Sequence, residues 1–238
     1  VLSGTSSSAT NPADQGHAVS GGSSSRSNVT MRNLWVKDAE RIRDGYAVFD
    51  MDGISNLSIT DCTITDAIGQ FGMFVRGNVG STSPPGSVGL GWTPANGVTI
   101  ARNNIIRTES GPFRLYSTQN GVVMDNYCEY NGIGPHSNKI SIYQQCHNIL
   151  MLRNRLRGAN GYVTWQEASD VCFVMNDMVV SYNTDDSGNI GRGIEDQNGG
   201  LISKSPPSAF DPAYRPTVNG SIVLNNRVMR SEEHTSEL

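Results

Sequence analysis

The chain has 238 residues, of which 17% are charged, and its formal net charge is −4. This balance excludes the basic surface that nucleic-acid-binding domains carry, because the Arg-rich segment 153–157 is short and local. No apolar run approaches the roughly 20 residues that a membrane-spanning helix needs. The sequence therefore predicts neither nucleic acid nor a membrane as a partner.

The two ends of the chain differ from its middle. We expect residues 1–15 to be the remnant of an N-terminal coil or a linker, and residues 16–229 to form one domain. Residues 230–238 match the in-frame translation of a common sequencing adapter, so we expect them to add no strand. We also expect the natural chain to continue beyond both ends, which would leave the first and last coils of the domain uncapped.

A short phrase recurs along residues 16–229. It consists of two aliphatic residues at alternate positions, an Asn three residues later, and an apolar residue two places further on. Close copies are built around Asn103, Asn154 and Asn176, looser copies have Cys62, Asn126 or Asn226 in the Asn place, and the first copy has its Asn one place early, at Asn33. Alternation on both sides of a fixed residue predicts two short strands joined by a bend, with Asn at the bend because it tolerates a left-handed backbone.

The spacing of the copies predicts stacked coils. Asn154 and Asn176 are 22 residues apart, which is enough for one minimal coil. A third strand is predicted between copies, at apolar runs that mostly begin with Gly: 45–49, 72–76, 112–116, 139–143, 161–165 and 193–197. Three strands per coil and about seven coils make a triangular solenoid, in which the Asn side chains should form one axial line and satisfy one another.

In these repeats the chain resembles the right-handed parallel β-helices of the pectin-lyase-like superfamily, over residues 16–229. The resemblance implies an all-β fold, a polysaccharide partner and a secreted or cell-surface location, although residues 1–5 show no signal peptide. It does not select an activity, because this superfamily includes lyases, hydrolases, epimerases, phage tailspikes and adhesins.

The third strands also predict a binding surface. If the leading residue of each run is numbered zero, the second and fourth places face solvent and repeat about every 4.8 Å along the solenoid. The substrate-binding candidates chosen on this basis are Phe49, Phe74, Arg76, Tyr116, Trp165 and Glu195, together with Glu167 just after the fifth run. An exposed ladder of rings and guanidinium groups favours a glycan ligand. The alternative is that flanking loops cover the rings, which would then serve ordinary packing.

Three reactions on such a face need different residues. β-Elimination of a uronate requires a cation beside the carboxylate and a base for the adjacent proton. The candidate catalytic residues are Lys139, Arg114, Tyr143 and His136. Glycoside hydrolysis requires two carboxylates about 5 to 9 Å apart. Asp50 with Asp52, or Glu167 with Glu195, would supply such a pair, but the signatures of polygalacturonase-like hydrolases are absent.

Two short segments resemble parts of known enzymes. The segment 134–137 is similar to an element of alginate epimerases but lacks both of its acids, and the segment 137–139 is similar to the Lys-bearing strand of chondroitinase-B-like and alginate lyases but lacks their Arg-His-Gly partner. We therefore predict a lyase or epimerase that acts on a uronate-containing glycan. The alternative is a non-catalytic glycan-binding module, similar to a phage tailspike or adhesin, so the residues leave open whether the protein is an enzyme.

The cysteines and acids give little indication of a metal or cofactor. Cys62, Cys128, Cys146 and Cys172 lack the spacing of a zinc site, and we expect free thiols rather than disulfides. The segment 50–53, Asp-Met-Asp-Gly, is either a calcium-binding segment or a turn, and the turn is favoured. No cofactor is predicted beyond that calcium alternative.

Overall fold

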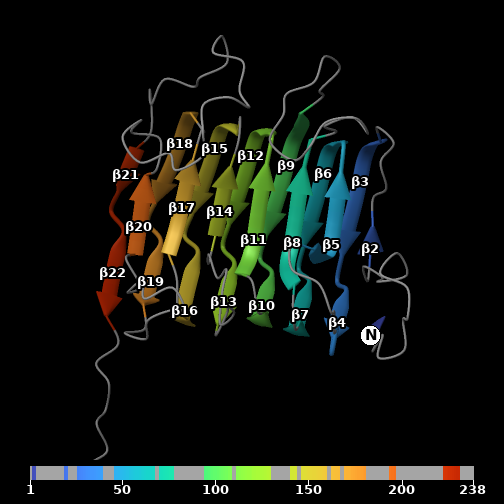
Figure 1. The fold of residues 1–238 in the computed structure, drawn as a ribbon, viewed down its shortest axis with the longest axis horizontal. Coiled ribbons are helices and arrows are strands. Elements are labelled where there is room, and N and C mark those ends of the chain that lie inside the picture. The colour runs from blue at the N-terminus through green and yellow to red at the C-terminus, as the bar shows by residue number, and fades with distance from the viewer. Residues whose placement is uncertain are drawn as a thin grey trace, which may run out of the picture.

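The computed structural model describes most of the predicted domain. The described residues are 2–3, 19–20, 26–39, 46–67, 70–77, 94–108, 111–129, 140–143, 146–159, 162–166, 169–180, 193–196 and 222–230. They form strands joined by short corners, and Figure 1 shows the strands standing side by side along one long axis, from blue at the N-terminal end to red at the C-terminal end.

The strands form three sheets. Sheet A contains β1 (Leu2–Ser3), β4 (Trp35–Lys37), β7 (Thr63–Ala67), β10 (Asn104–Thr108), β13 (Tyr127–Glu129), β16 (Arg155–Ala159), β19 (Asp177–Val180) and β22 (Arg227–Arg230). Sheet B contains β2 (Val19–Ser20), β5 (Tyr46–Asp52), β8 (Gln70–Arg76), β11 (Gly111–Tyr116), β14 (Ile140–Tyr143), β17 (Tyr162–Gln166) and β20 (Gly193–Asp196). Sheet C contains β3 (Arg26–Arg32), β6 (Ile54–Thr60), β9 (Ala95–Ala101), β12 (Thr118–Met124), β15 (His147–Leu152), β18 (Ser169–Val174) and β21 (Ile222–Leu224).

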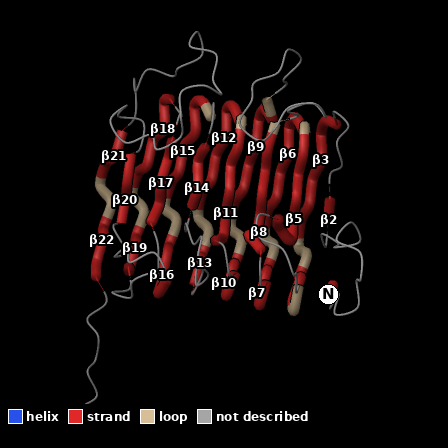
Figure 2. Tube along the Cα trace, viewed as in Figure 1, coloured by secondary structure: helices blue, strands red, loops and turns tan. Residues whose placement is uncertain are grey.

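The chain visits the sheets in a fixed rotation. A strand of sheet C is followed by one of sheet A and then one of sheet B, so neighbours within a sheet are three elements apart and pair in parallel. Figure 2 shows the strands as nearly continuous red segments separated by short tan corners. This arrangement confirms the predicted parallel β-helix with three strands per coil.

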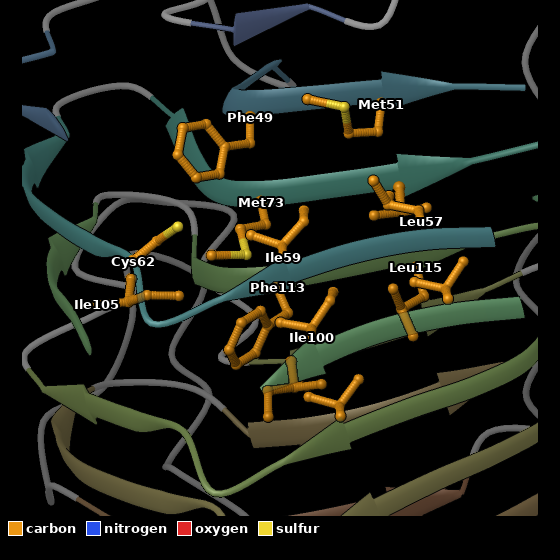
Figure 3. Packing of buried hydrophobic residues seen from close by; sticks show 14 of the residues in the cluster. Phe49, Met51, Leu57, Ile59, Cys62, Met73, Ile100, Ile105, Phe113 and Leu115 are labelled. Atoms are coloured by element: carbon orange, nitrogen blue, oxygen red, sulfur yellow. The ribbon is translucent and has the colours of Figure 1, made fainter. Parts of the chain in front are cut away.

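The core fills the space between the three sheets. Sheet B contributes the inward column Phe49, Met73, Phe113 and Ile140, and sheet C contributes Ile59, Ile100, Val123 and Met151. Figure 3 shows Phe49, Met73 and Phe113 stacked from coil to coil beside Ile59 and Ile100. Each fully buried side chain of this size stabilises the fold by about 1.5–3 kcal/mol, so the stacked columns are the main source of stability.

The predicted line of Asn side chains is present at the corner between sheets C and A. The Asn126 Nδ2 group donates to Asn154 Oδ1 at 2.9 Å, and Asn154 Nδ2 donates to Asn176 Oδ1 at the same distance. Asn103 precedes them and Asn226 follows them in the same line. Cys62 takes the next place before Asn103, whose Oδ1 accepts the Cys62 backbone N–H at 2.9 Å. We call this line the Asn ladder.

Asn was expected at the bend because it tolerates a left-handed backbone, but the Asn residues of the ladder are not the left-handed residues. The left-handed residue is the one before the ladder residue: Asp61, Arg102, Asp125, Arg153, Met175 and Asn225 have φ between 52° and 56°. Asn33 also has a φ of 56°, so this Asn, one place early in its phrase, lies at the left-handed corner and not in the ladder. The ladder residues are Asn because their buried amides bond to both neighbouring coils.

The remaining predictions about the chain have mixed outcomes. All four cysteines are thiols rather than disulfides, as expected. Sheet A begins within residues 1–15, at β1, and ends at Arg230 in β22, one residue beyond the expected boundary; residues 231–238 lie outside the described part. Among the described residues, no helix is long and apolar enough to cross a membrane.

Candidate functional site: a cation–aromatic face on sheet B

The outward side of sheet B gathers rings and charges from consecutive coils. The Cα register places Asp50, Phe74, Arg114 and Ser141 in one column, and Asp52, Arg76, Tyr116 and Tyr143 in the next. We call the set Asp50, Asp52, Phe71, Phe74, Arg76, Arg114 and Tyr116 the Phe–Arg face. Neighbouring coils lie about 4.8 Å apart, so residues far apart in sequence meet here.

Arg114 lies against two aromatic rings. Its guanidinium carbon is 5.2 Å from the ring centroid of Phe71 and 5.3 Å from that of Phe74. The Phe74 ring in turn meets Tyr116 edge-on, with centroids 6.3 Å apart and planes at 72°. Contacts of this kind contribute about 0.5 to 2 kcal/mol each, so the ring cluster holds the cation of Arg114 in place.

Arg76 lies between two carboxylates. Its Nη2 is 3.4 Å from Asp50 Oδ1, and its Nε is 3.4 Å from Asp52 Oδ2. The guanidinium carbon also lies 5.1 Å from the centroid of the Phe74 ring. Asp50 is buried, whereas the Asp52 and Arg76 side chains keep 19% and 29% of their surface exposed. The group therefore combines two carboxylates and one guanidinium in a place that solvent reaches only partly.

Burial raises the pKa of Asp52 above its ordinary value of 3.8. Arg76 lowers that pKa and Asp50 raises it, but neither effect is as large as the loss of solvent. Asp52 Oδ1 is also buried, with no hydrogen-bond partner among the described residues. The local environment thus already disfavours the negative charge that Asp52 carries.

A break in the pleat of sheet B explains why two Phe rings meet outside the solenoid. Val48 and Phe49 are consecutive residues, yet both belong to the core. Gly72 lies opposite Val48 in the register, and a Cβ there would come within 2.8 Å of the Pro112 carbonyl oxygen. Because two successive positions face inward, the residue before them faces outward, and Phe71 packs with Phe74 in a small cluster separate from the core.

Several predicted site residues occupy the positions expected of them. Arg76, Arg114 and Tyr116 lie on the outward face and are partly exposed. Glu195 falls in the column that contains Arg114, and Tyr143 is the Cα partner of Tyr116. Phe74 is in the predicted column, but it is only 6% exposed and so does not form part of an open ladder.

The prediction for Phe49 was wrong, and the backbone register at Trp165 differs from the expected one. Phe49 pairs with Met73 and is completely buried in the core, so it contributes nothing to the outward face. The Cα partner of Trp165 is Ile142, which is buried. Numbering each run from its leading residue had predicted Tyr143 as this partner. This numbering failed because the leading Gly is not at a fixed place: the real register is shifted by three residues in β5 and by one in β17.

Three further candidates, His136, Lys139 and Glu167, lie outside the described residues. Conversely, the substrate-binding candidates omitted Asp50, Asp52 and Phe71, which belong to the face. The alternation of Asp50 and Asp52 around Met51 was the signal for the first two, because it places both carboxylates on one side of a strand. Phe71 carried no such signal, since it depends on the break in the pleat.

The acids of this face do not fit a calcium site. Asp50 and Asp52 are strand residues, which also corrects the expected turn; the left-handed corner is Gly53, with φ 61°. Both carboxylates face Arg76, and the described residues contain no cluster of three or more His, Cys, Asp or Glu that could hold a metal ion. Two carboxylates beside a guanidinium do not provide the six to eight oxygen ligands that calcium takes.

Comparison with known proteins agrees with the architecture. The family model described as the right handed beta helix region matches residues 10–178, which is more than two thirds of the chain. No curated protein and no solved structure matches the chain. Together with the three parallel sheets, the match shows that the chain belongs to the right-handed β-helix family.

Proposed function

We propose that the Phe–Arg face binds a uronate-containing polysaccharide and acts on it as a lyase or an epimerase. The observation that carries this proposal is the position of Arg114, a partly exposed residue whose guanidinium rests on Phe71 and Phe74 next to the Tyr116 ring. A cation and a partly exposed phenol ring within one cluster are groups that recognition of an acidic sugar uses. A polysaccharide substrate also favours a secreted or cell-surface location.

Both reactions share their first step. A base removes the proton on the carbon next to the uronate carboxylate, and negative charge develops on that carboxylate. Arg114 would bind the carboxylate and stabilise this charge, because a guanidinium held by neighbouring rings needs little reorganisation. In a lyase, the bond to the leaving sugar oxygen then breaks, a carbon–carbon double bond forms, and the oxygen takes up a proton. In an epimerase, a proton returns to the opposite side of the same carbon.

The base would come from the column beside Arg114. Tyr116 lies two residues after Arg114 in β11, and Tyr143 occupies the same column in the next coil. Lys139 immediately precedes β14 and His136 lies three residues earlier. Because coils are about 4.8 Å apart, a sugar whose carboxylate meets Arg114 would lie within one coil of the backbone at Tyr116 and Tyr143.

The test uses the whole chain with a panel of uronate polysaccharides. Ultraviolet absorbance detects the unsaturated product of a lyase, and incorporation of deuterium from heavy water detects an epimerase. We expect turnover of at least one polymer, and we expect Arg114→Gln to reduce kcat by at least about 100-fold while binding weakens less than about tenfold. Arg155→Gln is the matched control, because Arg155 is an exposed arginine of sheet A and should leave kcat unchanged.

The outcomes separate three cases. Turnover that depends on Arg114 and not on Arg155 supports the proposed chemistry. Binding that depends on Arg114 without any turnover would replace the enzyme by a glycan-binding module. If no polymer binds, or if both variants behave alike, the Phe–Arg face is not the site.

A further inference from the structure

Charge is distributed unevenly along the Phe–Arg face. At the β5 end, the carboxylates of Asp50 and Asp52 face the single guanidinium of Arg76, so this group carries one net negative charge when both acids are ionised. At the β11 end, Arg114 places its positive charge over the Phe rings. The β5 and β11 strands are two coils apart, or about 10 Å, so a polysaccharide lying along the solenoid would meet both ends at once.

The acidic end is accessible enough to act on a ligand. Asp50 is buried, so its carboxylate can act on a ligand only through its electric field. Asp52 and Arg76 are partly exposed and can contact a ligand. Sugar hydroxyls are hydrogen-bond donors that a carboxylate accepts, whereas a second carboxylate brought to this place would be repelled. The two ends of the face therefore favour different kinds of sugar.

We propose that Asp52, together with Asp50, is a specificity-determining residue that excludes a uronate from the β5 end of the face. The preferred substrate is then a polysaccharide in which the sugar at the β5 end, about 10 Å from the uronate held by Arg114, is uncharged, rather than a polymer of uronate alone. This inference rests on the proposed function, since it assumes that Arg114 binds the uronate.

The charges around Asp52 are consistent with this role. Asp50 is on the same strand and Arg76 is on β8, and among the described residues these are the two charged groups that act on the Asp52 carboxyl. The raised pKa of Asp52 reports that one negative charge is already unfavourable here, despite Arg76. A uronate carboxylate at the same end would meet the same environment.

The experiment compares two uronate oligosaccharides of equal length. One contains only uronate, and the other contains a single uronate followed by uncharged sugars. Binding to the whole chain is measured by calorimetry at pH 7 and physiological ionic strength, because salt screens exposed charges. We expect the oligosaccharide with a single uronate to bind about tenfold more tightly, or better. Asp52→Asn should largely remove this preference by improving binding of the uronate-only oligosaccharide.

The control and a second measurement keep the result interpretable. Glu129→Gln changes the net charge of the chain by the same amount on sheet A and should preserve the preference of the wild-type protein. If Asp52→Asn does not fold, the wild-type preference is measured as the pH is lowered from about 7. The preference should narrow as Asp52 becomes protonated, and its raised pKa means that this happens above the pH at which an ordinary aspartate takes up its proton.

Equal binding of the two oligosaccharides by the wild-type protein, or an unchanged preference in Asp52→Asn, would overturn the inference while leaving the proposed function intact. Absence of binding to either oligosaccharide would instead overturn the proposed function, and the inference with it.

Discussion

The Asn ladder and the Asp50–Asp52–Arg76 group are both buried or partly buried polar clusters, but they differ in how their groups are satisfied. Asn154 is fully buried, and its side-chain amide and backbone N–H together make five hydrogen bonds to neighbouring coils, at 2.8 to 3.2 Å. The contacts of Arg76 with its carboxylates are longer, at 3.4 Å, and Asp52 Oδ1 has no hydrogen-bond partner among the described residues.

This difference distinguishes a polar cluster that stabilises the fold from one that belongs to the candidate site. A buried polar network with every group satisfied makes the structure rigid and unique, whereas an incompletely satisfied one costs stability and is typical of a site that interacts with a ligand. The ladder therefore fixes how coils stack, and the Asp50–Asp52–Arg76 group is where the fold tolerates an unfavourable charge. The following variants test this contrast, beginning with the largest expected effect.

Replacing Asn154 by Leu should lower the free energy of unfolding by about 2 to 3 kcal/mol. The change removes the amide that bonds Asn126 and Asn176, and leaves buried donors and acceptors without that partner. Urea denaturation measures the loss. The control is Asn96→Leu, which removes one exposed hydrogen bond from Asn120 and should cost about 1 kcal/mol or less. Equal losses in the two variants would contradict a special role for the buried ladder.

Replacing Asp52 by Asn should raise stability at pH 7, by less than the ladder variant lowers it. The folded-state pKa of Asp52 lies above the unfolded value of 3.8, so the ionised carboxylate costs stability once the pH exceeds that folded pKa. Below pH 3.8 the carboxyl is neutral in both states, and the advantage of Asn should vanish. Melting temperatures of both proteins between pH 3 and pH 8 check the sign. A less stable variant at pH 7 would mean that the Arg76 contact outweighs burial.

Replacing Cys62 by Asn should extend the ladder by one coil and raise stability by about 0.5 to 1 kcal/mol. The Cys62 thiol lies 3.9 Å from the Met31 carbonyl oxygen, which corresponds to the Ile59 carbonyl that Asn103 Nδ2 contacts at 3.0 Å. An amide at position 62 could therefore make the same bond. Denaturation midpoints of wild-type and variant proteins test this, with Cys62→Ser as a polar control that is too short to reach. Clear destabilisation by Asn would show that the ladder ends at Asn103 for reasons of space.

Replacing Asp61 by Asn should have the smallest effect and the opposite pH dependence to Asp52→Asn. Hydrogen bonding to Arg102 lowers the pKa of Asp61 from 3.8 to about 2. The carboxylate therefore contributes stability above pH 3.8, and the contribution is lost as the pH falls through about 2. Because this pair is solvent-exposed, added salt should also weaken it. A melting-temperature difference that persists at pH 2, or that ignores salt, would argue against an ionic contribution.

Much of the fold was predictable because each copy of the repeat is a short contiguous segment of the sequence. The phrase around Asn103, Asn154 and Asn176 predicted the corner between two strands, and in the copies at Asn103 and Asn154 its alternating apolar residues belong to the inward columns of the structure. The left-handed residue was not predictable in the same way. Arg102, Arg153 and Met175 adopt it although such side chains rarely favour it, because the stacked neighbours dictate the path of the chain.

The candidate site was predictable only in part. Arg76, Arg114 and Tyr116 lie in strands whose leading Gly or Pro happens to mark the true register, so their outward positions followed from the sequence. Phe49 and Trp165 lie in strands where that mark is shifted, and a shift by an odd number of residues moves a side chain to the other face. Nothing within either strand reveals the shift.

By itself, the sequence determined that this protein is a solenoid of stacked three-strand coils, because strand period and corner residues are properties of short segments. Only the tertiary structure decided which side chains meet on its surface. Asp50 and Arg76 are contributed by different coils, and their contact depends on how β5 pairs with β8 across an intervening corner, a strand of sheet C and a strand of sheet A. The hydrogen bonds that set this register join backbones and are the same for any side chain, so the meeting of charges and rings is a consequence of packing that no local pattern records.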